Sequence, residues 1–299
     1  NCCFVQAFSS LHNSDPALFR YMFADDRVMQ INFVGESGID AGGVFREGVA
    51  VMAADLFSDH FNLFILCPNG QHETYHNCDK FVPNPKHTSP LALEMFEFTG
   101  KLMAMSLRAK LMMPFEVTSM VWKALCDEPV TIDDLRDIDA ISVQLITAIR
   151  SCEEEGVCDV DAFSMKYGDK LKWTYNGSDG VERELVPGGA SKVVTYDNQN
   201  AFCDAMLLAR LAEFDKQTAA IKRGMVDIIP MRLLKLFSWQ QVEVLVSGDP
   251  KIDIELWKSR TDCNVSARCA QLFWKVMESL TNKEQSAFIR FAWGRSRLP

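Results

Sequence analysis

Membrane spans, basic patches and paired cysteines are scarce or missing in this sequence of 299 residues. No apolar run approaches the roughly 20 residues of a membrane span, and no signal peptide is visible at the start. The net charge of −9 argues against nucleic acid, because that binding depends on basic contacts to phosphate, and against anionic membrane surfaces. We therefore predict neither nucleic acid nor membrane as a partner. Asn1 is not an initiator residue, so we expect the natural chain to begin upstream.

The ten cysteines show no C-x-x-C spacing of the kind that zinc sites and redox motifs use. They are scattered through apolar or helical contexts. A chain long enough for a large core needs no disulfide bonds to fold, so we interpret them as reduced thiols. This predicts an intracellular protein, in the cytoplasm or, as the alternative, in the nucleus.

A glycine-rich stretch, Gly35–Glu47, has four glycines within nine residues. The run Val28–Val34 before it predicts a strand, and the spacing of apolar residues up to Phe57 after it predicts a helix, with Asp40 placed to accept its first N–H groups. A phosphate loop would need G-x-x-x-x-G-K-[ST] or G-x-G-x-x-G, and neither is present. We predict a tight structural connection and no cofactor. The nucleophile elbow G-x-S-x-G is also missing.

One literal metal motif is present, the H-E-x-x-H of His72, Glu73 and His76. Zinc hydrolases need both histidines on one face of a helix. Here the flanking residues are turn formers, and histidines four apart in a strand lie about 13 Å apart. We interpret the motif as a chance match and predict no metal site, with a zinc hydrolase using these three residues as the alternative.

The apolar periodicity predicts an α+β fold that is mainly α. Helices are predicted at residues 1–27, 44–57, 91–107, 115–125, 141–152, 198–229, 231–237, 240–246, 267–280 and 283–293. Strands are predicted at residues 28–34, 63–67, 72–76, 162–167, 172–175 and 181–185, and residues 251–258 are expected to be extended. The run Thr131–Asp134 resembles a helix start, and Asn176–Gly180 is a turn signal.

Four motifs in register cover nearly the whole chain. They are Gly35–Glu47; Pro187–Gly189 with Val194, Thr195 and Asn198; Phe237 with Glu243, Leu245, Gly248, Asp253 and Trp257; and Phe273–Trp274 with Phe288, Phe291, Gly294 and Ser296–Pro299. Together they resemble the HECT domain, the catalytic module of one class of ubiquitin ligases. One departure is Gly48, where the family usually has an aromatic residue.

The resemblance implies a bilobal fold with an L-shaped, helical larger lobe and a small inserted α+β subdomain. Residues 1–126 and 190–261 would form the larger subdomain, and residues 127–189 would recruit a ubiquitin-conjugating enzyme. Residues 262–266 would be a hinge, and residues 267–299 would begin the second lobe. In the family, a cysteine in a His-Thr-Cys-Phe-like stretch accepts ubiquitin as a thioester and passes it to a substrate lysine.

None of the ten cysteines follows His-Thr. We therefore expect the catalytic cysteine beyond Pro299, no catalytic residue in this chain, and no ligase activity of the chain alone. The implied partners are a ubiquitin-conjugating enzyme, ubiquitin and protein substrates. A non-catalytic helical scaffold is the rival interpretation.

The resemblance also implies a hydrophobic groove that accepts an aromatic side chain from the conjugating enzyme. By position, its residues would be Ile146, Ile149, Phe163, Met165, Phe202 and Met206. Phe202 and Met206 are four apart and share a helical face, whereas Phe163 and Met165 are expected on a strand. The inserted subdomain itself carries Ile149, Phe163, Met165, Trp173 and Tyr175, and a private core made of some of these side chains is the alternative interpretation.

Overall fold

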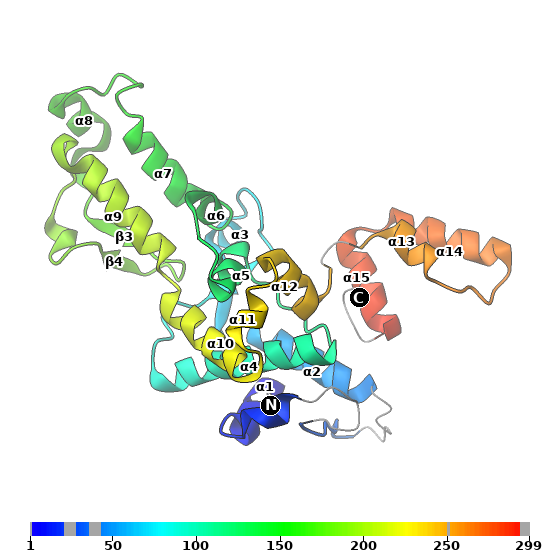
Figure 1. Cartoon of the computed structure of the whole chain (residues 1–299). Helices are drawn as coiled ribbons and strands as arrows, with labels where there is room; N and C mark the ends of the chain where they lie inside the picture. The colour runs from blue at the N-terminus through cyan, green and yellow to red at the C-terminus, as the bar shows by residue number, and fades with distance from the viewer. Residues whose placement is uncertain (1, 21–27, 36–42, 250–251, 294–299) are drawn as a thin grey trace. The chain divides into compact units, whose positions relative to one another are not determined.

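The computed structural model describes residues 2–20, 28–35, 43–249 and 252–293 (Figure 1). Helices dominate and the strands are short, so the predicted class, α+β and mainly α, is confirmed. The chain divides into two compact units. The first comprises Asn1–Leu56, Phe98–Phe115 and Gly224–Pro299, and the second Phe57–Glu97 and Glu116–Arg223. The glycine-rich turn, including Asp40, and the Ser296–Pro299 motif lie outside the described residues.

The first unit is helical. Its elements are α1 (Cys3–Leu11), the 3-10 helix η1 (Pro16–Arg20), α2 (Gly43–Leu56), the end of α4 (Pro90–Ala109), the end of α10 (Asp215–Ile228), α11 (Met231–Leu234), α12 (Trp239–Ser247), α13 (Ile254–Ser259), α14 (Ala267–Ser279) and α15 (Asn282–Trp293). Phe4 and Phe8 lie four residues apart on one face of α1. Both pack on Phe98, with ring centroids 5.6 and 5.7 Å away. This aromatic contact joins α1 to α4.

Three predictions fail in the first unit. Within the described residues, the single helix predicted over residues 1–27 is two elements, α1 and η1, which residues 12–15 separate. Residues 28–34 form no strand, because a strand needs a neighbour with which to pair. Ile31 instead packs on Gly48, where a Cβ atom would come 2.3 Å from Ile31 Cδ1. That contact leaves no room at position 48 for the aromatic residue of the family unless Ile31 moves. Residues 254–259, expected to be extended, form α13, whose first turn is capped by Asp253 accepting from Leu256 N at 2.9 Å.

The second unit carries both small sheets. Its elements are β1 (Phe64–Leu66), α3 (Pro68–Gln71), β2 (Phe81–Pro83), the start of α4, α5 (Ser119–Cys126), α6 (Ile132–Arg136), α7 (Ala140–Arg150), α8 (Val160–Tyr167), η3 (Gly168–Lys170), β3 (Thr174–Asn176), β4 (Glu182–Glu184), η4 (Gly189–Ser191), η5 (Tyr196–Asn198), α9 (Gln199–Leu211) and the start of α10. Strand β1 pairs antiparallel with β2, and β3 pairs antiparallel with β4. The predicted turn at Asn176–Gly180 joins β3 to β4.

Three predicted elements of the second unit are wrong. Residues 72–76 are not the partner of β1; that partner is β2. Residues 162–167 are helical, because Asp159 caps α8 by accepting from Ala162 N at 2.8 Å. The single helix predicted over 198–229 is two helices, α9 and α10. The break between them lets Glu213 accept from Ser178 N at 2.8 Å.

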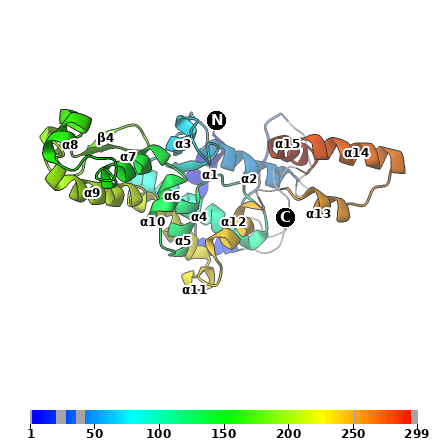
Figure 2. The ribbon, with the colours of Figure 1, turned by 90° about the horizontal axis from the view of Figure 1, so that it is seen from above.

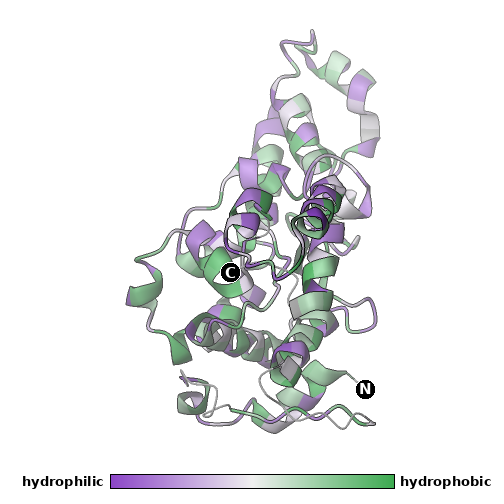
Figure 3. Ribbon diagram, turned by 90° about the vertical axis from the view of Figure 1, so that its right-hand side faces the viewer, coloured by the Kyte–Doolittle hydropathy of each residue, from purple (hydrophilic) through white to green (hydrophobic). Residues whose placement is uncertain are grey.

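The helices combine hydrophobic and hydrophilic stretches, which Figure 3 shows as green and purple along the same ribbons. This is the pattern of helices that cover a core on one side and meet water on the other. Among the described residues, no helix has both the length and the apolar character to cross a membrane.

Candidate partner-binding site

The structure brings five of the six predicted groove residues together in one cluster. Ile146 and Ile149 come from α7, Phe163 from α8, and Phe202 and Met206 from α9. None of the five is more than 4% exposed. They are therefore largely interior residues, of which Phe202 and Met206 also line a groove. These five side chains form a core that residues 127–189 share with α9, so it is not private to the predicted inserted subdomain.

Met165 is the exception, with 88% of its surface exposed. Its separation from Phe163 follows from the helix. Residues two apart share a face in a strand but lie on different sides of a helix. Because residues 160–167 are α8, Phe163 enters the core and Met165 points to solvent.

The core of this cluster is aromatic. Trp173 meets Phe202 edge to face, with ring centroids 5.9 Å apart, and Lys192 Nζ lies 4.1 Å from the centre of the Trp173 ring. Phe163 packs on Tyr167 with centroids 4.7 Å apart. The cluster combines residues before Gly189 with residues of α9. The predicted segment 127–189 therefore shares its core with α9.

A groove of about 450 Å³ opens on this core between α7 and the β3–β4 hairpin. Figures 1 and 2 both place α7, α9 and this hairpin side by side. Its lining is mixed. Polar and charged residues such as Asp139, Lys172 and Glu182 line it, and its apolar residues are Pro68, Ile141, Leu145, Leu171, Tyr175, Phe202 and Met206. Ile141 is 48% exposed, whereas Leu145, Leu171 and Tyr175 are half-buried. A partner can therefore touch these four residues, and they form what we call the rim.

The sequence analysis missed the rim, although one signal was available. Ile141 and Leu145 are four apart on α7, a spacing that places both on one helical face.

Burial of the Tyr175 side chain raises the pKa of its hydroxyl. The rim residue therefore stays neutral at physiological pH and can offer an O–H donor at the edge of an apolar groove.

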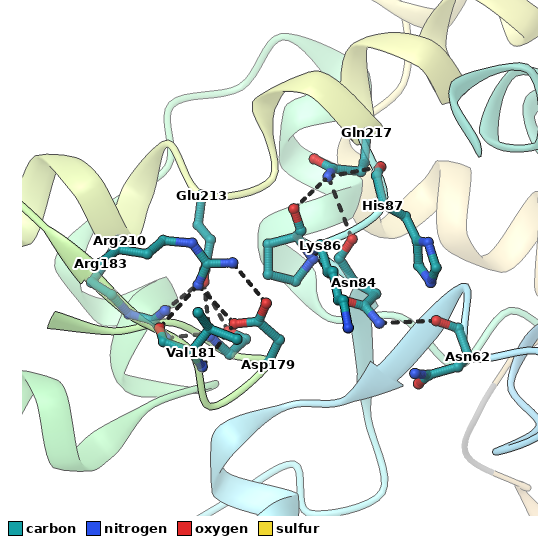
Figure 4. A network of polar contacts seen from close by, with 12 residues as sticks. Asn62, Asn84, Lys86, His87, Asp179, Val181, Arg183, Arg210, Glu213 and Gln217 are labelled. Carbon is teal, nitrogen blue, oxygen red and sulfur yellow. Dashed lines mark hydrogen bonds and ion pairs between the residues drawn. The ribbon is translucent and has the colours of Figure 1, made fainter. Parts of the chain in front are cut away.

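Two polar networks of the second unit are seen in Figure 4, one on the hairpin that borders the groove and one away from the groove. On the hairpin, Arg183 pairs with Asp179 at 2.6 Å. Further along, Gln217 Nε2 donates to the carbonyl oxygens of Asn84 and His87 at 3.4 and 3.3 Å. These bonds join the start of α10 to the loop that follows β2.

The H-E-x-x-H residues lie in an irregular loop after α3. Glu73 and Tyr75 have φ angles of 51° and 63°, in the left-handed region, so His72 and His76 do not share a helical face. Within the described part of the chain, no cluster of three or more His, Cys, Asp or Glu residues could hold a metal ion. The zinc hydrolase interpretation has lost its geometric basis.

All ten cysteines lie in the described part of the chain, and all are free thiols. Burial raises the pKa values of Cys126 and Cys203 to about 11, so neither thiol ionises readily at neutral pH. Four cysteines are exposed: Cys78, Cys158, Cys263 and Cys269.

The predicted hinge at residues 262–266 lies in the loop between α13 and α14. Trp257 and Trp274, on either side of this loop, meet edge to face with ring centroids 5.5 Å apart. Both belong to a small core with Met277 and Ile289. A hinge motion at this loop would have to separate the two tryptophans. The structure shows one arrangement of this loop, and the hinge stays a prediction.

The chain was compared with known families and proteins. Residues 50–299 match the family described as HECT-domain (ubiquitin-transferase). The chain is 34% identical to the E3 ubiquitin-protein ligase HERC2 of Mus musculus over 91% of its own length and 6% of HERC2. It is 29% identical to the ligase ptr1 of Schizosaccharomyces pombe, over 99% of the chain and 9% of ptr1.

A third relative is the E3 ubiquitin-protein ligase Smurf1 of Drosophila melanogaster, 26% identical over 91% of the chain and 25% of Smurf1. The chain thus spans a small part of each of these relatives. The motif at Gly35–Glu47 lies before the matched residues, whereas the other three lie within them. With the family pattern matching residues 50–299, the resemblance is confirmed, and this chain belongs to the HECT-domain family.

Proposed function

We propose that this chain is part of a ubiquitin ligase and that it recruits a ubiquitin-conjugating enzyme through the groove between α7 and the β3–β4 hairpin. The observation that carries the proposal is the groove itself, about 450 Å³ in volume, with an apolar rim above an aromatic core. Its volume lies in the range of ligand pockets, about 300–1,000 Å³, and leaves room for a large side chain of a partner loop. Family membership makes the conjugating enzyme the partner to test first.

The rim residues supply the contact surface in this proposal. Ile141 and Leu145 would meet the partner from one side, and Leu171 and Tyr175 from the other. The buried residues beneath them, Phe202 included, shape the floor and touch the partner only where the groove reaches them. An interface of this size leaves little free energy after the cost of association, so binding should be weak and exchangeable.

The chemistry proposed for the whole protein is a two-step transfer. A cysteine thiolate attacks the thioester carbon of ubiquitin on the conjugating enzyme, and the thiolate of that enzyme leaves. A substrate lysine amine then attacks the new thioester, and the ligase thiolate leaves. We assign neither step to the ten cysteines of this chain, because none follows His-Thr.

The domain assignment is part of the proposal. Residues 127–189 together with α9 would form the recruiting subdomain, and residues 1–126 with the rest of 190–261 the larger subdomain. Residues 267–299 would begin the lobe that carries the cysteine, with the hinge before them at 262–266.

The test is a binding titration against a panel of ubiquitin-conjugating enzymes. The variant combines Ile141→Ala with Tyr175→Ala, and Leu208→Ala is the control, because Leu208 is 67% exposed on α9 and does not line the groove. We expect the double variant to bind at least about tenfold more weakly and the control to bind like the unmodified chain. The proposal fails if the chain binds none of the panel, or if the double variant binds as well as the control.

A further inference from the structure

We propose that Arg210 is a positioning residue for partner recruitment, which fixes the separation of the two groove walls by bonding to both of them. The inference rests on the proposed function of the groove. Arg210 lies in the last turn of α9 and is 0% exposed. A fully buried guanidinium is costly unless its N–H groups find charged or polar partners, so its contacts determine what it does.

The first contact of Arg210 is with the α7 wall. Arg210 Nη2 donates to Asp139 Oδ2 at 2.8 Å. Asp139 is the N-cap of α7 and accepts from Ser142 N at 2.9 Å. Ile141, Ser142 and Leu145 follow directly on α7 and line the groove. The position of this wall therefore depends on where Arg210 holds Asp139.

The second contact is with the hairpin wall. Arg210 Nη2 also donates to Ser178 Oγ at 3.3 Å, and Arg210 Nη1 pairs with Glu213. Glu213 in turn accepts from Ser178 N at 2.8 Å and from Ser178 Oγ at 2.9 Å. Ser178 is the middle of the β3–β4 turn, next to Gly177, which lines the groove. The hairpin is thus joined to the same guanidinium as α7.

The turn has little freedom to relax independently. A Cβ atom on Gly177 would lie 1.9 Å from Arg183 Nη1 and 2.7 Å from Glu213 Oε1. Arg183 is itself held by Asp179 within the hairpin, and Figure 4 shows Arg183, Asp179, Arg210 and Glu213 converging on this turn. Because the turn is this crowded, a shift of Arg210 or Glu213 moves the hairpin rather than being absorbed by the loop.

The ion pairs of Arg210 are better suited to holding α7 and the hairpin in position than to stabilising the fold. One buried cation faces two carboxylates, Asp139 and Glu213, and Arg210 Nε has no hydrogen-bond partner among the described residues. Burial raises the pKa of Glu213, although Arg210 opposes the shift. Buried ion pairs of this kind are often replaceable by apolar residues without loss of stability. Their contribution here is to fix the position of α7 relative to the hairpin.

Arg210→Lys tests the proposal, because it keeps the charge while a single ammonium replaces the fork that reaches both walls. Two readouts are measured on the same protein: affinity for the conjugating enzyme, and hydrogen exchange of the amides of Ser178 and Gly180. Lys123→Met is the matched control. It breaks the Lys123–Asp134 ion pair, 2.8 Å long, in the same unit, and neither residue lines the groove.

We expect Arg210→Lys to weaken binding about tenfold and to speed exchange at the turn by a similar factor. Lys123→Met should leave the affinity and the hydrogen exchange unchanged, even if it lowers the unfolding temperature as much as Arg210→Lys does. Ser178→Ala, which removes only the hydroxyl contacts, keeps the test available if Arg210→Lys does not fold, and should show the same effects at smaller size. The proposal is overturned if the folded Arg210 or Ser178 variant matches the control in both readouts. If the unmodified chain binds no conjugating enzyme, the proposed function fails, and hydrogen exchange alone decides whether Arg210 positions the hairpin.

Discussion

Phe202→Ala should destabilise this protein severely rather than act as a clean interface mutation. Phe202 is 0% exposed and meets Trp173 edge to face, with centroids 5.9 Å apart. Truncation forfeits the transfer free energy of most of a buried phenyl ring, roughly 2–3 kcal/mol, and leaves a cavity beneath the groove. The sum for buried Phe→Ala changes is about 3–5 kcal/mol. That is a large share of the 5–15 kcal/mol that holds a typical domain folded.

Chemical denaturation measures this prediction, with Ile141→Ala as the comparison. Ile141 borders the same groove but is already 48% exposed, so its truncation should cost less than about 1 kcal/mol. The reasoning is refuted if Phe202→Ala lowers the free energy of unfolding by no more than Ile141→Ala. That result would mean that Phe202 is accessible to solvent and contributes little to the core beneath the groove.

Three other predictions follow from burial and charge. Met165→Ala should change the free energy of unfolding by less than about 0.5 kcal/mol, measured by denaturation, because Met165 is 88% exposed. Burial would raise the pKa of Asp134, but hydrogen bonds from Lys123 and Thr131 lower it below the ordinary 3.8. The stabilisation that the ionised Asp134 carboxylate contributes should therefore be complete above pH 3.8 and be lost as the pH falls below that value. Asp134→Asn should make the free energy of unfolding depend less on pH in that acidic range. Iodoacetamide should leave Cys126 and Cys203 unmodified in the native protein, because burial raises their pKa values to about 11, and mass spectrometry should find the label first on Cys78, Cys158, Cys263 and Cys269.

The sequence predicted those elements that local patterning determines. Helices α2, α4 and α7 lie where the spacing of apolar residues placed them. The start of α6 was visible in Thr131–Asp134, which forms a capping box. The turn between β3 and β4 was visible in its run of Asn, Gly, Ser and Asp.

The errors arise where tertiary contacts or ambiguous patterns decide. Residues 162–167 alternate apolar and polar like a strand, yet Asp159 caps them as a helix. No local signal marks the break after α9. The contact made there, in which Glu213 accepts a hydrogen bond from Ser178 N, joins residues far apart in the sequence. The loop at residues 72–76 has left-handed backbone at Glu73 and Tyr75. Neither Glu nor Tyr is a residue type that predicts this conformation.

For the candidate site, the family resemblance named five residues that the structure places in one cluster, but not how deeply each of them is buried. Phe202 and Ile146 were both expected to line a groove and are both fully buried, but only Phe202 lines it, from beneath. Which apolar residues become floor and which become rim depends on how α7, α9 and the hairpin pack together. That packing depends on Arg210, which bonds to both Asp139 and Ser178. The sequence pattern of its helix does not mark Arg210 as a special residue.

The proposed recruitment of a conjugating enzyme is tested most directly by photocrosslinking. A photoreactive amino acid is placed at position 141 in one protein and at position 208 in another, and each is irradiated with the members of a conjugating-enzyme panel. Both positions are exposed, but only the first borders the groove. Recruitment through the groove predicts a covalent complex from position 141 and none from position 208. Crosslinking from position 208 alone, or from neither position with an enzyme that binds the chain in titration, would contradict it.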